Sequence, residues 1–395
     1  MNKNLYLQAG LMSLSAIYFI YRYLTQPATI YLIFASLFVF LLLAHRALPL
    51  RWRGLATNLG FSLIFLDLVF HQVDLALMFR SLREANYWML IPAVSFLVVS
   101  YPLRAWRWGW LLRQTKDVNF SSLLSTFAIG IAANIVMPAR AGEFLRAYLL
   151  GHKEGISKTT VFASVVVERI CDGLTVVFSL LFVVALIGFR RQEMKYMAVL
   201  GLAFYFGVIL ALALLYFRKG FVIGLAKAVL PEKLSARAIG LFESFLAGVR
   251  ILRDWRQVGM IVLLSLLTWA AIGLSLWPVL LAFDFGAPVP SYTPLLLIGI
   301  LGLSVMIPTP GGVGPFQYGC LLGLRITFAS GMSTLPADFD EKAAAFSLVL
   351  HLSHLIPEVI VGLAFFLGES IRWEEVGVYE AAEVGDGGLG MGDGE

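Results

Sequence analysis

The chain has 395 residues, of which 59% are hydrophobic and 14% are charged, and its formal net charge at pH 7 is +5. Several uncharged runs reach the roughly 18 residues that cross a bilayer, which excludes a soluble globular protein. These runs are 4–21, 23–45, 85–103, 196–217, 257–283 and 285–324. The sequence therefore predicts an all-α integral membrane protein, built as a polytopic helix bundle.

The N-terminal segment, residues 1–45, is predicted to form a transmembrane hairpin. Lys3 precedes the first apolar run, no small-residue cleavage site follows it, and a second run comes almost at once. This pattern indicates a retained anchor. Residues 46–368 are expected to form the main transmembrane domain. Cys171 and Cys320 lie in apolar runs, so a disulfide is not expected.

Basic residues suggest which segments face the cytoplasm. They cluster at 46–53, at 107–116 and most densely at 218–256, where eight basic residues stand against three acidic ones. Residues 221–253 alternate apolar and basic groups without a spanning run, which predicts amphipathic helices on the inner surface. A count of membrane crossings along the chain places the basic residues Arg190, Arg191 and Lys195 outside, in conflict with the positive-inside rule.

The first interruption follows the uncharged run 119–139. If this run crossed the bilayer, the basic loop beyond it would be outside. We therefore predict a re-entrant helical hairpin: residues 121–136 descend, Pro138 breaks the helix, and 139–150 return to the cytoplasmic side. Gly142 belongs to the same break.

The second interruption divides the run 285–324, and its flanks are poor in basic residues. A re-entrant hairpin entering from the opposite face is predicted here. The breaking residues are Pro308, Pro310, Gly311, Gly312 and Gly314. Gln317 could bridge the backbone groups that such a break exposes, although a tight turn without a ligand is an alternative. Two interrupted segments of opposite orientation are typical of transporters with inverted repeats.

Three charges, Glu168, Arg169 and Asp172, interrupt the apolar stretch 159–189. Each costs roughly 2.5–3.5 kcal/mol at the bilayer centre unless it finds a partner or water. Glu168 and Asp172 share one helix face, so their cations must come from other segments. The candidates are Arg104, Arg107, Arg140 and Arg146.

With Arg169, these four candidates make five arginines. Against the three carboxylates Glu143, Glu168 and Asp172 they leave a surplus of two positive charges. Because arginine binds phosphate oxygens bidentately, an anionic lipid headgroup could neutralise this surplus. The predicted headgroup site contains these eight residues and Gln317. An internal ion-pair network is the alternative, as is interfacial anchoring for Arg104 and Arg107.

His351, His354 and Glu358 have a spacing compatible with one helix face. A hydrogen-bonded buried pair of histidines is favoured over a metal site, since no third and fourth ligand are evident. No metal or cofactor is predicted. No P-loop motif is present, so ATP hydrolysis is not expected.

Four segments, LRAWRWGWLLRQ, NIVMPARAGEFLR, GISKTTVFASVVVERICDG and PTPGGVGPF, carry a resemblance to a known family. Over roughly residues 55–368 the chain resembles the lysylphosphatidylglycerol synthase transmembrane-region family, also called flippase-like or UPF0104 proteins. The resemblance implies a bundle with re-entrant segments that moves lipids between leaflets, and it adds Asn134 to the headgroup site. Many members have Glu where Gln317 stands and Arg near His351, departures that bear on headgroup selection or proton coupling.

The expected function is that of a lipid flippase or transporter for an anionic, polyprenyl or glycolipid-type lipid. The alternative is a membrane enzyme or a scaffold subunit of a lipid or glycolipid synthesis pathway. Lysyl transfer is not expected, because the bifunctional synthases carry a large soluble domain and only residues 369–395 follow here.

Residues 369–395 hold eight acidic groups and one basic group, Arg372, in a glycine-rich tail expected to be disordered. The expected location is a bacterial or archaeal cytoplasmic membrane, with the C-terminus inside. The expected partners are a membrane lipid as substrate and, for a scaffold, a glycosyltransferase or lipid synthase. Nucleic acid is not an expected partner, and a homodimer is compatible with the sequence.

Overall fold

The computed structural model describes residues 3–44, 49–137, 141–187, 254–307, 309–329 and 334–369, together with six isolated residues between 207 and 239. All regular structure in these ranges is helical, as predicted. The helices are α1 (Lys3–Thr25), α2 (Thr29–Leu43), α3 (Leu50–Phe70), α4 (Leu75–Glu84), α5 (Leu90–Leu112), α6 (Phe120–Val136), α7 (Gly142–Glu154), α8 (Lys158–Ile187), α12 (Trp255–Leu281), α13 (Thr293–Ser304), α14 (Pro315–Ala329) and α15 (Phe339–Gly368), with short 3-10 turns η1 (Tyr87–Met89) and η4 (Pro310–Gly312).

Some predicted features lie outside the described residues. They include the apolar run 196–217, the basic residues Arg190, Arg191 and Lys195, almost all of 221–253, and the tail beyond Glu369.

In the described part of the chain, five helices are long and apolar enough to cross a membrane, which makes the protein a multi-pass membrane protein. They comprise Trp52–Phe70, Tyr87–Leu112, Lys158–Leu186, Trp255–Leu281 and Phe339–Gly368. Shorter apolar helices occur at Thr29–Leu43, Phe120–Val136 and Thr293–Ser304.

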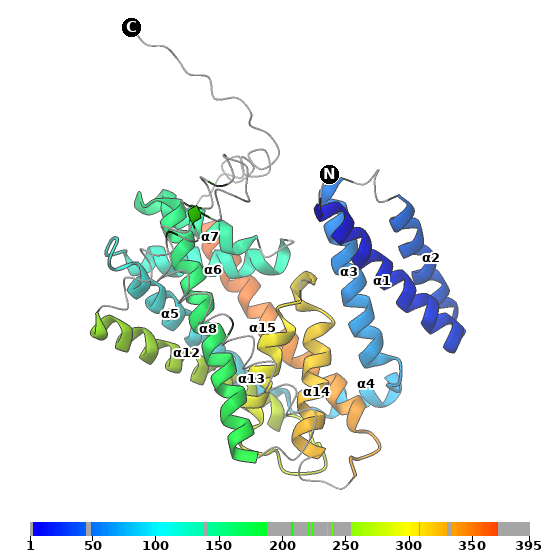
Figure 1. The fold of residues 1–395 in the computed structure, drawn as a ribbon. Coiled ribbons are helices and arrows are strands. Elements are labelled where there is room, and N and C mark those ends of the chain that lie inside the picture. Colours follow the sequence, from blue (N-terminus) through cyan, green and yellow to red (C-terminus); the bar gives the residue numbers. More distant parts are fainter. Residues whose placement is uncertain are drawn as a thin grey trace.

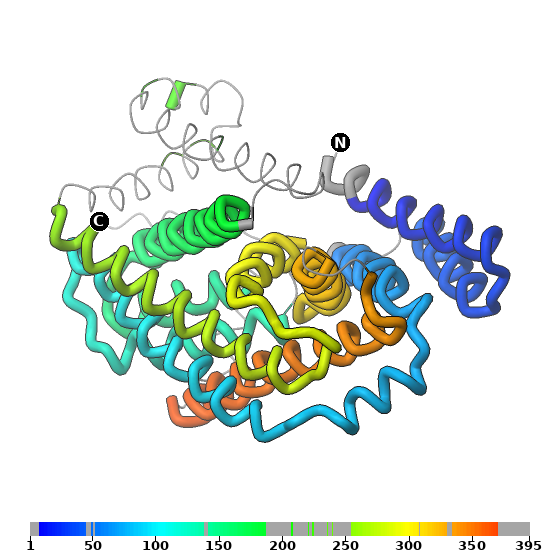
Figure 2. Tube along the Cα trace, turned by 90° about the horizontal axis from the view of Figure 1, so that it is seen from below, coloured from blue at the N-terminus to red at the C-terminus, as the bar shows by residue number. Residues whose placement is uncertain are grey.

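Helices α1 and α2 pack together at one edge of the bundle, and α3 contacts both α1 and α14 (Figures 1 and 2). The contact between α1 and α3 includes a polar group beside apolar packing. Asp67 of α3 accepts hydrogen bonds from the Tyr18 hydroxyl at 2.6 Å, from Nε of Arg22 at 2.8 Å and from the Tyr31 hydroxyl at 2.8 Å. These bonds fix the N-terminal pair to the main bundle.

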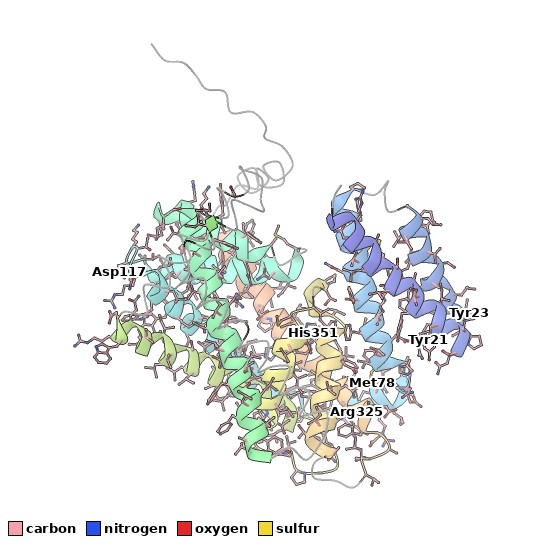
Figure 3. All side chains as sticks on the ribbon, in the orientation of Figure 1. Tyr21, Tyr23, Met78, Asp117, Arg325 and His351 are labelled. Carbon is pink, nitrogen blue, oxygen red and sulfur yellow. The ribbon has the colours of Figure 1, made fainter. Side chains whose placement is uncertain are left out.

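The main core lies where α12, α13, α14 and α15 meet. Its centre is a group of aromatic rings in which Phe285 contacts Phe328, Phe339 and Phe346 with centroid distances of 5.2, 6.0 and 6.0 Å. His351 of α15 lies in the interior of the bundle, whereas Tyr21, Tyr23 and Asp117 lie at its outer edges (Figure 3).

The first break separates α6 from α7. Asn119 caps α6 by accepting a hydrogen bond from the Ser121 amide at 3.1 Å, and the helix ends where Met137 adopts extended angles. A Cβ atom on Gly142 would lie 2.0 Å from the Gly130 carbonyl oxygen, so only glycine permits this approach of α7 to α6. Pro138 lies outside the described residues.

The second break separates α13 from α14. Gly311, Gly312 and Gly314 have φ values of 57°, 75° and 96°, in the left-handed region that favours glycine. Helix α3 supports this turn, because the Ser62 hydroxyl donates to the Val313 carbonyl at 2.7 Å. Pro308 falls outside the described ranges.

Candidate functional site

The charged side chains of α8 lie next to arginines from two other helices. An unpaired charge in an apolar environment is costly, so such partners are expected. Nη2 of Arg107, on α5, lies 2.8 Å from Oδ1 of Asp172 and 3.3 Å from Oε1 of Glu168. Arg107 and Glu168 have no solvent exposure, and Asp172 is 7% exposed. The arginine therefore offsets the repulsion between two carboxylates on the same helix face.

Arg146 of α7 supplies the second cation. Its Nη2 donates to Oε2 of Glu168 at 2.7 Å, and its guanidinium lies 4.9 Å from the Trp108 ring centroid and 5.8 Å from that of Phe127. Aromatic faces favour a desolvated guanidinium. A buried carboxylate with two arginine partners thus joins α5, α7 and α8.

Arg169 forms the boundary between this buried ion cluster and the open space beside it. It contacts Glu143 at 3.5 Å, Glu168 at 3.3 Å and Asp172 at 3.4 Å. Its side chain is 37% exposed, unlike those of Arg107 and Arg146. Arg169 can therefore contact a ligand without leaving the cluster.

The open space is a polar cavity of about 340 Å³ in which both helix breaks meet. The end of α6 lines one side, and the turn before α14 lines another. Helices α3, α5, α7, α8 and α15 contribute the remaining walls. The lining residues are Leu55, Asn58, Arg104, Ile131, Asn134, Ile135, Val136, Met137, Glu143, Arg169, Val305, Thr309, Pro310, Gly311, Gly312 and Glu358.

The predicted headgroup residues divide into two groups. Arg104, Asn134, Glu143 and Arg169 line the cavity. Arg107, Arg146, Glu168 and Asp172 form the buried layer of ion pairs. Arg140 lies outside the described residues.

Arg104 has spare hydrogen-bonding capacity. Its guanidinium lies 5.3 Å from the Phe127 ring centroid, its Nε has no hydrogen-bond partner, and none of the described residues forms an ion pair with it. A guanidinium carries five N–H donors, and a partly buried one favours an anionic acceptor. Arg104 is the cation of this cavity best placed to receive a ligand oxygen.

Sequence reasoning missed Glu358 of α15 as a cavity residue, having considered it only beside the histidines. Its inclusion changes the charge count. The described residues of the cluster and cavity hold four arginines and four carboxylates. The sequence count of five arginines, which includes Arg140, against three carboxylates gave two excess positive charges. With Glu358 as a fourth carboxylate, one excess positive charge remains. Uncharged polar groups in the cavity wall, Asn58 and Thr309, were also missed.

Gln317 lies behind the cavity wall and does not line the cavity. Its Oε1 accepts from the Gly314 amide at 2.8 Å, and its Nε2 lies 2.9 Å from Nδ1 of His351. Because the amide nitrogen donates, Nδ1 accepts, and Nε2–H of His351 donates to the Gly311 carbonyl at 2.9 Å. Gln317 therefore contacts the Gly314 amide directly and the Gly311 carbonyl through His351.

The second histidine, His354, is also hydrogen-bonded, with Nε2 3.1 Å from the Ser275 hydroxyl and Nδ1 3.0 Å from the Leu350 carbonyl oxygen. Both histidines are therefore hydrogen-bonded to other groups of the bundle. In the described parts of the chain, no three histidine, cysteine or acidic side chains gather closely enough to hold a metal ion.

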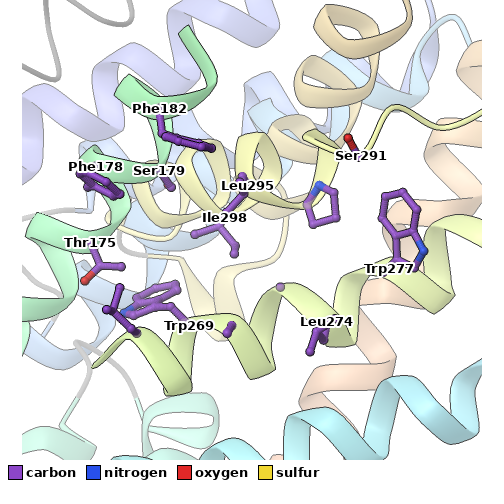
Figure 4. A pocket seen from close by; sticks show the side chains of 14 residues that line it. Thr175, Phe178, Ser179, Phe182, Trp269, Leu274, Trp277, Ser291, Leu295 and Ile298 are labelled. Carbon is purple, nitrogen blue, oxygen red and sulfur yellow. The ribbon is translucent and has the colours of Figure 1, made fainter. Parts of the chain in front are cut away.

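A second cavity, of about 640 Å³, is almost entirely apolar and lies between α8, α12 and α13 (Figure 4). Phe178 and Phe182 come from α8, and Trp269 and Trp277 come from α12. Phe178 is 62% exposed. This groove suits hydrocarbon chains and contrasts with the charged cavity.

Comparison with known proteins finds a matching family model and several similar proteins. The model of the family described as "Lysylphosphatidylglycerol synthase TM region" matches residues 54–362, so α1 and α2 precede the matched segment. Two relatives come from Methanocaldococcus jannaschii. UPF0104 membrane protein MJ1595 is 24% identical over 78% of this chain and 92% of its own length. UPF0104 membrane protein MJ1078 is 27% identical over 49% of this chain and 79% of its own length.

Glycosyltransferase AglD of Haloferax volcanii is 31% identical over 31% of this chain, and the match spans only 20% of AglD. The family match covers most of the chain, including both helix breaks and the ion cluster. The protein thus belongs to the lysylphosphatidylglycerol synthase transmembrane-region family.

Proposed function

We propose that this protein is a lipid transporter that moves an anionic lipid between membrane leaflets. The headgroup binds in the polar cavity, while the acyl or prenyl chains remain in the bilayer. The observation that carries this proposal is the cavity itself, where both helix breaks meet beside two arginines that can receive an anion, Arg104 and Arg169.

The cavity offers the donors that a phosphate needs. Arg104 has an unpaired Nε, and Arg169 is partly exposed. The side-chain amide nitrogen of Asn134 can add a neutral donor, because this residue lines the cavity. Charge-assisted hydrogen bonds of this kind are about twice as strong as neutral ones.

The buried ion pairs support the binding residues. Arg107 and Arg146 neutralise Glu168 and Asp172 and so hold α5, α7 and α8 at fixed separations. A binding site needs such a second layer to keep its contacting side chains in place. The cluster thus contributes to binding by positioning Arg169 and Glu143.

The helix pairs α6–α7 and α13–α14 are proposed to re-enter the membrane from opposite faces, with the C-terminus on the cytoplasmic side. Their helices have 17, 13, 12 and 15 residues, all shorter than the roughly 20 residues of a typical crossing. Their broken ends line one polar cavity, where irregular backbone is tolerated at membrane depth. Movement of one pair relative to the other would open the cavity to each leaflet in turn.

Leaflet exchange in proteoliposomes tests this function. Fluorescent phosphatidylglycerol is placed in both leaflets, and the fraction accessible to an external quencher is followed in time. Arg104→Gln and Arg169→Gln are expected to reduce exchange at least tenfold, since each loses a charged contact of about 1.5–3 kcal/mol. The control is Arg80→Gln on α4, whose side chain is 73% exposed. Equal exchange in the wild type and all three variants would contradict the proposal.

The alternative is a subunit of a lipid or glycolipid synthesis pathway that transports nothing. The similarity to part of glycosyltransferase AglD supports it. Deletion of the gene followed by complementation with Arg104→Gln separates the two functions. Full restoration of the cellular lipid profile by this variant would favour the subunit, because a structural partner does not need the cavity.

A further inference from the structure

Glu358 differs from every other carboxylate at the site. Glu143, Glu168 and Asp172 each contact an arginine within 3.5 Å. Glu358 lines the cavity, yet none of the described residues forms a hydrogen bond or an ion pair with it. An unpaired carboxylate in a membrane interior is costly and marks a candidate functional group.

The surroundings of Glu358 contain both signs of charge. Arg104 on α5, Glu143 on α7 and Arg169 on α8 line the same cavity as Glu358. The hydroxyl of Tyr101, also on α5, is buried without a hydrogen-bond partner and interacts electrostatically with Glu358. On its own helix, His354 lies one turn earlier and is hydrogen-bonded to Ser275. The two arginines would repel a cationic group that approached Glu358.

An anionic headgroup held by Arg104 and Arg169 would share the small cavity with this carboxylate. Two negative charges at close range in a poorly hydrated space repel strongly. With Glu358 ionised, the described arginines and carboxylates balance. With Glu358 protonated, they leave one positive charge, which matches one phosphodiester.

We infer that Glu358 takes up one proton when an anionic headgroup enters the cavity, so that lipid and proton bind together. The proton comes from the aqueous phase and forms the O–H bond of a neutral carboxylic acid, which then donates a hydrogen bond to a phosphate oxygen. This inference rests on the proposed headgroup site. It makes a transmembrane proton gradient a source of energy for lipid movement.

Calorimetry with the full-length protein in nanodiscs tests the inference. The probe is dihexanoyl phosphatidylglycerol, whose phosphodiester keeps a single negative charge between roughly pH 5 and 9. Binding enthalpies in two buffers of different ionisation enthalpy give the number of protons taken up. For the wild type we expect about one proton per lipid, and an affinity that falls up to tenfold per pH unit at alkaline pH.

The Glu358→Gln variant mimics the protonated acid. Its expected proton uptake is near zero, and its affinity at alkaline pH should match that of the wild type at acidic pH. Glu84→Gln, at an exposed position of α4, is the matched control and should behave as the wild type.

Other outcomes overturn different parts of the account. Wild-type binding without proton uptake, or unchanged uptake in Glu358→Gln, would refute the role of Glu358 as proton acceptor. It would not refute the proposed function. Tighter binding of dihexanoyl phosphatidylcholine that depends on Glu358 would show that the carboxylate receives a cationic headgroup instead. Absence of lipid binding by the wild type at every pH would refute the proposed function and the inference with it.

Discussion

Arg107 of α5 and Asp172 of α8 form a 2.8 Å ion pair in which the arginine is fully buried. Arg107→Leu removes the fully buried cation that Asp172 and Glu168 share, and it leaves the partly exposed Arg169 as their remaining common partner. Loss of one member of a buried pair costs about 3–5 kcal/mol, so we expect a large drop in the thermal unfolding temperature in detergent. Exposed Arg80→Leu is the control, and equal temperatures for both variants would refute the pairing.

Gly142 permits the close approach of α7 to α6. Gly142→Ala places a methyl group against the Gly130 carbonyl and the Asn134 amide. Overpacking of this kind costs about 1–3 kcal/mol or more, and it should also move Asn134 at the cavity wall. Gly259→Ala on α12 is the matched control, because nothing lies within 4 Å of its new Cβ. Thermal unfolding and lipid binding measure the two effects, and an unaffected Gly142→Ala would contradict this packing.

Gln317 holds the second break through backbone groups. Gln317→Leu keeps the size of the side chain but leaves the Gly314 amide without its acceptor and His351 Nδ1 without its donor. A buried polar group that loses its partner costs about 1–3 kcal/mol. We expect weaker lipid binding together with faster hydrogen exchange at residues 309–314. Unchanged exchange in this segment would show that the network does not stabilise the turn.

Asp67 attaches the N-terminal helices to the part of the chain that the family model matches. Asp67→Ala removes the acceptor shared by Tyr18, Arg22 and Tyr31. A hydrogen bond to a charged group contributes about 1.5–3 kcal/mol, and about 1.4 kcal/mol corresponds to a factor of ten. Hydrogen exchange in α1 and α2 should therefore rise tenfold or more. Exchange in α5–α8 should stay constant. Asp117→Ala, at an exposed position of the outer edge (Figure 3), is the control.

The sequence predicted the helix breaks and the partners of the buried charges for physical reasons. Each charge in an apolar helix needs a counter-charge, which limited the partners of Glu168 and Asp172 to a few arginines. Glycines and prolines located the turn around Gly311 because few other residues adopt its backbone angles.

Other relationships depend on how distant helices cross. Sequence spacing does not bring Glu358 of α15 near Arg104 of α5, and this neighbourhood requires the packing of α15 against α6, where Gly362 contacts Ala132. For the same reason, the division of the arginines into buried and cavity-facing groups could not be predicted. The bonds of Asp67 to α1 and α2 were also missed, although a lone carboxylate in the apolar helix α3 signals the need for a counter-charge.

The proposed transport depends on an anionic headgroup that binds between the two helix breaks. A phosphatidylglycerol analogue with a photoreactive group on its headgroup tests this most directly, followed by mass spectrometry of the labelled peptides. We expect labels within 131–137 and 309–312, and their loss in the Arg104→Gln, Arg169→Gln double variant. Labels confined to the apolar groove around Phe178 and Trp269, unchanged in that variant, would contradict it.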